Sequence, residues 1–225
     1  IFPAMFTVLD HKFCVGDPMV LFMEGKHVNV PVMSGNTSDE FPSYIEASSK
    51  EDLKKKAEEI FGKNAETFLR FPEAMQEDSD GKYAKVNGIE CTIKCLFSEK
   101  KSAGEKKPYY YYRFDPDIPG WDNAGTFHSV DLWFFFETLA KCWRPFVGQH
   151  YDLSRMMCNY WVNFIKTGDP NGNDADGKPM PYWYPYEKEK PCEMIFMSDR
   201  PVVNCGWVTP FKEFLQEQIK KTLPI

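Results

Sequence analysis

The 225 residues include 43% apolar, 27% charged and 16% aromatic ones, a composition that is typical of a folded globular protein and excludes an intrinsically disordered one. The 33 acidic residues outnumber the 27 basic ones, and the net charge of −6 argues against a nucleic-acid-binding protein, which needs a basic excess. The longest uncharged apolar run is too short for a membrane-spanning helix, and the length fits one domain or part of a larger one.

The first predicted elements are a strand and a helix. Valines alternate with other residues over 28–33, which indicates a strand that runs into a loop beginning at Ser34. Ser48 and Glu51 then form the S-x-x-E pattern of a capping box. The apolar residues that follow repeat at helical spacing, so we expect an amphipathic helix that ends at Gly62.

A second helix and a second strand are predicted in the middle of the chain. Apolar side chains recur at helical spacing over 89–97, and Gly104 is placed to end that helix. Consecutive aromatic residues over 109–114 predict a strand that is buried on both faces. The C-terminal part adds helices over 132–143 and 153–164, the latter ended by Gly168, a short strand over 193–198, and a helix with Thr209 as its N-cap.

These elements predict an α/β architecture, because strands alternate with helices along the chain. Only two strands are well marked, and a parallel sheet of two strands is too narrow to bury its faces. We therefore expect an incomplete mixed or parallel sheet covered by several helices. The chain starts at Ile1 rather than at a methionine, and we expect it to begin within a longer gene product.

The seven cysteines are an odd number, so at least one has no partner within the chain. They form no CxxC pair, and the four histidines are not clustered, so no metal site is predicted. We interpret the cysteines as buried or half-buried thiols. Neither the cysteines nor the N-terminal residues indicate the cellular location.

Two polar side chains lie in loops after predicted strands, where α/β proteins place functional groups. Glu40 follows the strand over 28–33, and His128 follows the strand over 109–114 and directly precedes a helix. The two are 128 − 40 = 88 residues apart, so only the fold can bring them together. A carboxylate bonded to one imidazole nitrogen fixes the tautomer, and the other nitrogen can then accept a proton from a nucleophile.

Five segments resemble, in the same order, segments of the type B carboxylesterases, the α/β-hydrolase family that also contains the cholinesterases. The segment that ends at Glu40 resembles the acid-bearing segment of the family, and the segment around His128 resembles its histidine segment. The other matches are the strand before that histidine, the helix and turn after it, and an aromatic, proline-rich stretch. The five segments are VPVMSGNTSDE (30–40), YYYRF (110–114), GTFHSVDL (125–132), YWVNFIKTGDPN (160–171) and MPYWYPY (180–186).

The resemblance implies an α/β-hydrolase fold in which residues 1–225 are the C-terminal part of a carboxylesterase domain. It also implies that Glu40 is the acid and His128 the general base of a Ser-Glu-His triad, which hydrolyses small carboxylic esters without a metal ion or cofactor. None of the 14 glycines begins the G-x-S-x-G motif that carries the nucleophile of this superfamily. We expect the serine in a missing N-terminal segment of the same protein, so the chain alone is predicted to be inactive.

Four aromatic residues near His128 are candidates for lining the substrate pocket, although core packing explains them equally well: Phe127, Trp133, Phe134 and Phe136. Asp131 falls where the family usually has an acidic residue, and we expect it to cap or brace the helix start. The alternative function is a non-catalytic, cholinesterase-like binding module, because fold alone does not determine function. With an exposed edge on the incomplete sheet, the chain is also expected either to form a homodimer through that edge or to rearrange away from the parent fold.

Overall fold

The computed structural model describes residues 8–40, 43–78 and 81–223, so Ile1 lies outside the described part. The main sheet has four strands in the order β1-β4-β5-β6. The first three run parallel, and β6 runs antiparallel to β5. The strands are β1 (Val32–Thr37), β4 (Tyr109–Phe114), β5 (Cys192–Phe196) and β6 (Pro201–Cys205). The predicted α/β architecture with a mixed sheet is confirmed.

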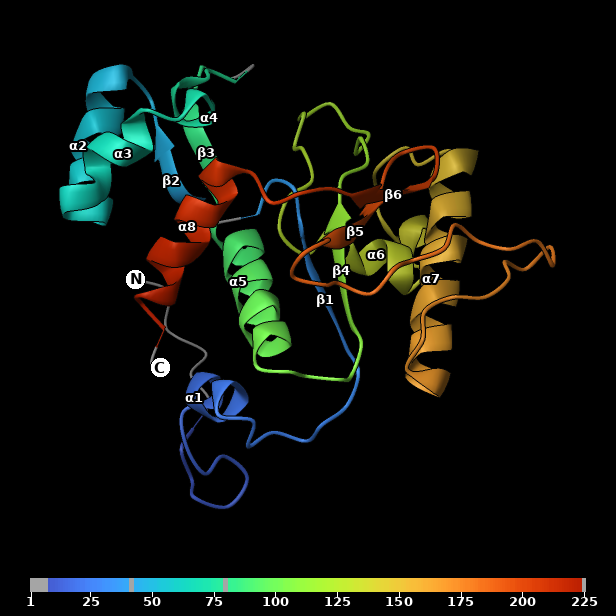
Figure 1. Ribbon diagram of the computed structural model, residues 1–225. Helices are drawn as coiled ribbons and strands as arrows, with labels where there is room; N and C mark the ends of the chain where they lie inside the picture. The colour runs from blue at the N-terminus through green and yellow to red at the C-terminus, as the bar shows by residue number, and fades with distance from the viewer. Residues whose placement is uncertain (1–7, 41–42, 79–80, 224–225) are drawn as a thin grey trace.

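Helices cover both faces of this sheet, as Figure 1 shows. α5 (Gly88–Ser102) lies on one face and α7 (Gly148–Thr167) on the other. The side chains of β4 alternate between the two helices, because neighbouring residues of a strand point to opposite faces. Tyr109 and Tyr111 pack in a cluster on the α5 side, whereas Tyr110 belongs to the larger core beside α7. Burial on both faces explains the aromatic run in β4.

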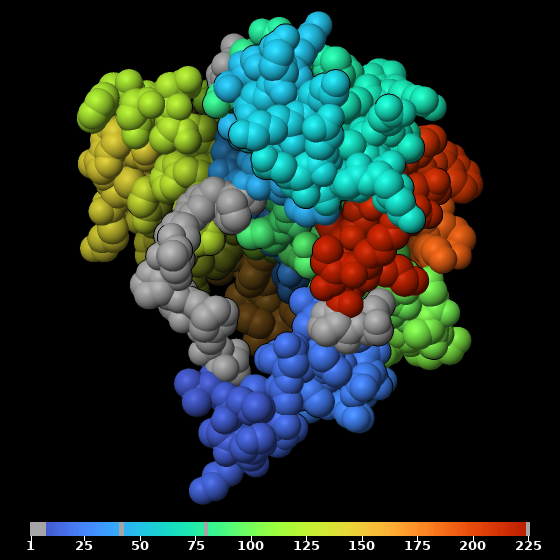
Figure 2. Space-filling view, turned by 90° about the vertical axis from the view of Figure 1, so that its left-hand side faces the viewer, coloured from blue at the N-terminus to red at the C-terminus, as the bar shows by residue number. Residues whose placement is uncertain are grey.

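A smaller unit lies beside the main sheet and is built on the antiparallel pair β2 (Ser43–Ala47) and β3 (Tyr83–Asn87). The C-terminal helix closes this unit, since Phe214 packs on Phe61 and Phe68. Figure 2 shows this helix in red against the cyan α2–α3 segment. The helical elements of the unit are α2 (Lys50–Phe61), η1 (Gly62–Asn64), α3 (Ala65–Leu69), α4 (Pro72–Met75) and α8 (Pro210–Lys220). Outside it lie α1 (Pro18–Met23), α6 (Leu132–Phe135) and η2 (Leu139–Lys141).

Local sequence signals set several helix ends. Thr209 caps the start of α8 through its side-chain oxygen, and Gly168 ends α7 in the left-handed conformation with a φ of 79°, both as predicted. α2 begins one residue later than the predicted capping box. Ser49, not Ser48, accepts the amide of Asp52, because Ser48 uses its own amide and hydroxyl to donate to the carboxylate of Asp52.

The first strand lies further along the chain than predicted. β1 begins at Val32 and continues through the expected loop to Thr37. Val28 and Val30 are exposed, at 78% and 48%, so their alternation does not mark a buried strand. The position of β1 is set by its parallel pairing with β4, which extends along its whole length.

The predicted helix over 132–143 is wrong. Only Leu132–Phe135 is α-helical, and Glu137 has a φ of 50°, which a continuous right-handed helix does not allow. A short 3-10 turn follows at Leu139–Lys141. The short helix packs on α7, and Leu139 of the turn belongs to the same core, because tertiary contacts outweigh helical spacing here.

Three strands of the structure were not predicted, namely β2, β3 and β6. Each has five residues, and pairing with a neighbour rather than a marked alternation defines it. Cys192 and Cys205 form a disulfide between β5 and β6. The interpretation as free thiols is wrong for this pair, because the antiparallel register places the two residues opposite each other.

Candidate active site

The acid of the candidate site lies three residues beyond the end of β1. Glu40 is almost completely buried, with 6% of its side chain exposed. Its Oε2 accepts a hydrogen bond from the Thr37 hydroxyl at 3.0 Å and a longer one from the Thr37 amide at 3.4 Å. Its other oxygen, Oε1, is hydrogen-bonded to Nδ1 of His128. Each carboxylate oxygen therefore has its own partner.

The imidazole lies on the loop that follows β4. The structure brings His128 against Glu40 across 88 residues of sequence. In contrast to the buried carboxylate, 52% of the His128 side chain is exposed. A carboxylate bonded to Nδ1 holds that nitrogen protonated and orients the ring, so that Nε2 can act as a general base toward a hydroxyl group.

Asp39 joins the two loops that carry these side chains. Its Oδ2 accepts hydrogen bonds from the Thr126 amide at 2.8 Å and the Thr126 hydroxyl at 3.1 Å. The Asp39 amide in turn donates to the Thr126 carbonyl at 3.2 Å. Gly125 allows this approach, because it has a φ of +63° and a Cβ atom there would lie 2.4 Å from Oδ2 of Asp39.

A lysine from the smaller unit strengthens this junction. Lys85 of β3 donates to Oδ1 of Asp39 at 2.7 Å. Burial by itself raises the pKa of Asp39, but the hydrogen bonds from Lys85 and Thr126 outweigh it and lower the pKa below its ordinary value. Asp39 is therefore a charged anchor between the loops. Sequence reasoning did not single out Asp39, Thr126 or Thr37, although all three lie inside the segments that resemble the family.

Asp131 does not cap the following helix through its side chain, contrary to the expectation. It accepts a hydrogen bond from the Tyr112 hydroxyl at 3.1 Å and is buried. Burial raises the pKa of Asp131, the Tyr112 hydrogen bond acts in the opposite direction, and the nearby charge of Glu40 raises the pKa further. The side chain therefore braces β4 against the loop of His128.

The four aromatic residues suggested for a pocket lie in different environments. Phe127, next to His128, packs edge-on against Trp133 with ring centroids 5.9 Å apart. Phe134 is fully buried and packs on Phe114 in the core beside α7. Phe136 is 68% exposed. A role of these residues in substrate binding stays a prediction.

Two cysteines on α5 are poor candidates for a nucleophile within the chain. Burial raises the pKa of Cys91 to about 12 and that of Cys95 to about 11, so neither is a reactive thiolate near neutral pH. Ser154 is also buried, and its hydroxyl donates to the Phe134 carbonyl. Across residues 8–40, 43–78 and 81–223, no group of three or more His, Cys, Asp and Glu side chains is arranged to hold a metal ion. Nor does that part of the chain contain a helix long and apolar enough to span a membrane.

The model of the family described as "Carboxylesterase family" matches residues 72–204, more than half of the chain. Carboxylesterase 4A of Bos taurus is 27% identical, in an alignment that covers 87% of this chain and 39% of the relative. The bile salt-activated lipase of Homo sapiens is 24% identical, over 81% of this chain and 27% of the relative. This chain thus spans less than half the length of either curated relative.

Solved structures support the fold. A PNB esterase superposes with a TM-score of 0.55 at 24% identity, over 93% of this chain and 42% of the esterase. A thermophilic PNB esterase superposes with a TM-score of 0.55 at 23% identity, over 90% of this chain and 41% of that esterase. The predicted α/β-hydrolase fold is confirmed, and this chain covers part of it. Together with the family match, the comparisons identify the chain as a member of the type B carboxylesterase family.

Proposed function

We propose that this chain supplies the acid, Glu40, and the general base, His128, of a Ser-Glu-His triad in a carboxylic ester hydrolase. The observation that carries the proposal is the hydrogen bond between a buried carboxylate and a half-exposed imidazole, which lie in two loops of a carboxylesterase-family fold. The nucleophile is a serine outside these 225 residues, since the sequence has no G-x-S-x-G motif. The whole chain then forms one part of a carboxylesterase domain.

In the proposed reaction the serine hydroxyl attacks the ester carbonyl while Nε2 of His128 takes its proton. The imidazolium that forms is stabilised by Glu40 through Nδ1. His128 then returns the proton to the leaving alcohol, and water repeats the cycle on the acyl-enzyme. Small esters with apolar acyl or alcohol groups are the proposed substrates, and neither a metal ion nor a cofactor takes part.

The test is ester turnover by the full-length gene product and by its Glu40→Ala and His128→Ala variants. Each variant is expected to lose about 10⁴-fold in kcat, as triad members do. Glu66→Ala and His11→Ala are matched controls, because both side chains are exposed and lie away from the site. Near-normal rates in the Glu40 and His128 variants refute the proposal and favour the non-catalytic binding module.

The isolated chain provides a second test. We expect no ester turnover from the 225 residues alone, because they hold the acid and base without the serine. Turnover that survives in the isolated chain and is abolished by one of its own serine substitutions refutes this part of the proposal.

We also propose that the isolated chain forms a homodimer through the edge of β1. This strand is at the end of the order β1-β4-β5-β6, so one of its edges has no strand partner among the described residues. Such an edge exposes backbone donors and acceptors to a second chain. A mass that stays monomeric in size-exclusion and scattering measurements at all concentrations contradicts this proposal.

A further inference from the structure

The carboxylate of Glu40 is held by the side chain of the last residue of β1, the strand that precedes it. Thr37 is buried, and its hydroxyl is 3.0 Å from Oε2 of Glu40, whereas its amide is at the longer distance of 3.4 Å. The hydroxyl is therefore the better donor to this oxygen. While it donates, the carboxylate cannot turn about its last side-chain bond, and Oε1 stays directed at His128.

The position of Thr37 depends in turn on two asparagine side chains. Its carbonyl oxygen accepts hydrogen bonds from Nδ2 of Asn36 at 2.9 Å and from Nδ2 of Asn87 at 3.1 Å. The side-chain oxygen of Asn36 accepts the hydroxyl of Tyr111. Asn36 and Tyr111 are both buried, so water cannot replace these bonds easily.

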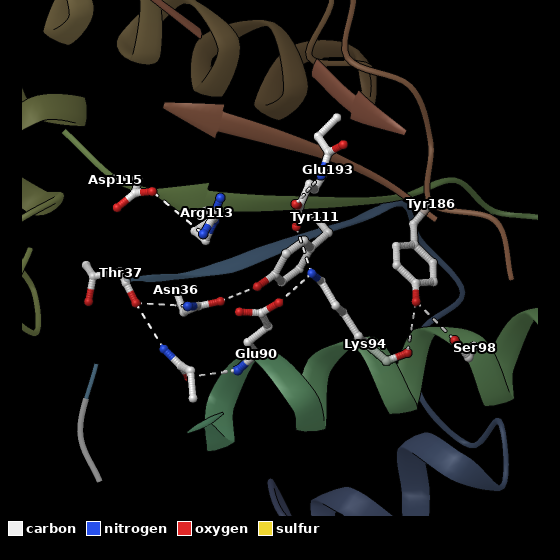
Figure 3. A network of polar contacts seen from close by, with 12 residues as sticks. Asn36, Thr37, Glu90, Lys94, Ser98, Tyr111, Arg113, Asp115, Tyr186 and Glu193 are labelled. Atoms are coloured by element: carbon white, nitrogen blue, oxygen red, sulfur yellow. Dashed lines mark hydrogen bonds and ion pairs between the residues drawn. The ribbon is translucent and has the colours of Figure 1, made fainter. Parts of the chain in front are cut away.

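The far end of this chain of contacts is a cluster of one lysine and two glutamates, shown in Figure 3. Lys94 of α5 lies over the Tyr111 ring, with its nitrogen 4.5 Å from the ring centroid. The same nitrogen donates to Glu90 at 2.6 Å and to Glu193 at 2.7 Å. Figure 3 shows Tyr111 reaching from β4 toward Asn36, between this cluster and Thr37. Polar contacts therefore continue from α5 to the residue that holds Glu40.

We propose that Thr37 is a positioning residue for Glu40, and that the Tyr111 hydroxyl, acting through Asn36, keeps Thr37 in place. This inference rests on the hydrogen bond between Glu40 and His128, which is also the basis of the proposed function. Loss of the Thr37 hydroxyl frees the carboxylate to rotate, and the hydrogen bond to Nδ1 is then made for a smaller part of the time. The imidazole consequently loses its preference for a proton on Nδ1.

The test is an NMR measurement on the 225-residue chain labelled with ¹⁵N in histidine, at mildly alkaline pH. The ring nitrogen shifts report which tautomer each imidazole adopts, and His128→Ala assigns the signals of that residue. We expect the unsubstituted chain to hold His128 with the proton on Nδ1. Thr37→Val, which has a similar shape, is expected to change the tautomer ratio about fivefold toward Nε2–H, the equivalent of one ordinary hydrogen bond.

Three further variants separate positioning from general damage to the fold. Thr37→Ser keeps a hydroxyl and is expected to restore the Nδ1–H tautomer. Tyr111→Phe removes only the hydroxyl that bonds Asn36, and we expect a smaller change in the same direction. Tyr160→Phe is the matched control, because it removes the hydroxyl of a buried tyrosine on α7, which donates to the Pro181 carbonyl on the other face of the sheet. This control is expected to leave the His128 signals unchanged.

The outcomes distinguish this inference from the proposed function. Unchanged His128 signals in both Thr37→Val and Tyr111→Phe overturn the positioning role while the triad assignment stands. A mixture of His128 tautomers in the unsubstituted chain overturns both the positioning role and the triad assignment. If the tautomer responds as expected but the full-length protein turns over no ester, the positioning role holds and the proposed function fails.

Discussion

The two partners of the candidate site are supported by opposite kinds of structure. Glu40 has 6% of its side chain exposed and is held by hydrogen bonds, whereas His128 has 52% exposed and lies on a loop where its neighbour Phe127 packs against Trp133. An acid that only orients an imidazole can be buried and fixed. A base that must reach a hydroxyl on another part of the protein has to stay accessible. The difference in exposure is therefore what the proposed triad role of the two residues requires.

The supports also differ in chemistry. On the acid side, the Tyr111 hydroxyl of β4 bonds to Asn36 of β1, and Lys94 of α5 bonds to Glu193 of β5 inside the protein. On the base side, Arg144 binds Asp122 at 2.9 and 2.7 Å and the Pro119 carbonyl at 3.1 Å, and its guanidinium lies 5.2 Å from the Phe127 ring centroid. The acid side therefore depends on satisfied charges, and the base side on packing and one arginine. Substitutions can therefore weaken the contacts of Glu40 and those of the His128 loop separately.

The largest effect is expected from Lys94→Met on the acid side. It leaves Glu90 and Glu193 without their shared cation, and breaking a buried ion pair from one side costs about 3–5 kcal/mol of unfolding free energy. We expect the upper end of that range, because two carboxylates lose their partner. Denaturant unfolding measures the loss, and Lys55→Met, at an exposed ion pair, is the control with little effect.

The pH dependence of this loss sharpens the prediction. Burial raises the pKa of Glu193, but Lys94 outweighs it and lowers the pKa below its ordinary value. A carboxyl with a lowered folded-state pKa stabilises the fold above its unfolded-state pKa, and that contribution is lost as the pH falls through the folded-state pKa. In Lys94→Met, by contrast, protonation of the buried Glu193 raises the unfolding free energy, because a neutral carboxyl needs no cation. The difference in unfolding free energy between the unsubstituted chain and Lys94→Met should therefore narrow from pH 7 toward about pH 4. A difference that stays constant over this range contradicts the explanation.

On the base side, the two neighbouring phenylalanines of the expected pocket should behave very differently. Phe134→Ala leaves a cavity in the core and is expected to cost about 3–5 kcal/mol of unfolding free energy. Phe136→Ala, at a 68% exposed side chain, should stay within about 0.5 kcal/mol. Thermal or denaturant unfolding of both variants measures the difference. Similar losses in the two would show that the burial assigned to them is wrong.

Arg144→Met is expected to loosen the loop that carries His128. The substitution keeps much of the aliphatic stem but removes the hydrogen bonds to Asp122 and Pro119. Stability should fall less than in Phe134→Ala but more than in Arg200→Met, whose exposed ion pair is worth about 0.5 kcal/mol or less. Hydrogen exchange should accelerate over 115–131 and not in α5. Unchanged exchange in that loop would count against the role of Arg144.

The smallest change in unfolding free energy is expected from Asp131→Asn, at a residue between Glu40 and the His128 loop. Burial and the charge of Glu40 raise its pKa above the ordinary value, although the Tyr112 hydrogen bond opposes them. An acid with a raised folded-state pKa reduces stability at pH values above that pKa, and the cost disappears on acidification. Asp131→Asn keeps an acceptor for Tyr112 and should therefore raise the unfolding free energy slightly at pH 7 but not at low pH. A loss of stability at pH 7 would contradict this reading.

Much of the fold was determined by local sequence. The aromatic run of β4, the Thr209 cap and Gly168 predicted their elements, because strand burial and helix ends depend on residues within a few positions. The short strands β2, β3 and β6 carry no such local signal. The disulfide between Cys192 and Cys205 likewise required the pairing of β5 with β6 to be known.

For the candidate site, the sequence by itself determined the residue types and the order of Glu40 and His128 in family-like segments. Only the tertiary structure decided that the two touch, because parallel pairing of β1 with β4 brings the loops after both strands to the same end of the sheet. The anchoring by Asp39 and Thr126 arises in the same way, whereas the contact of Thr37 with Glu40 joins residues only three positions apart. A hydrogen bond between residues distant in sequence depends on distance and burial, which no local pattern encodes.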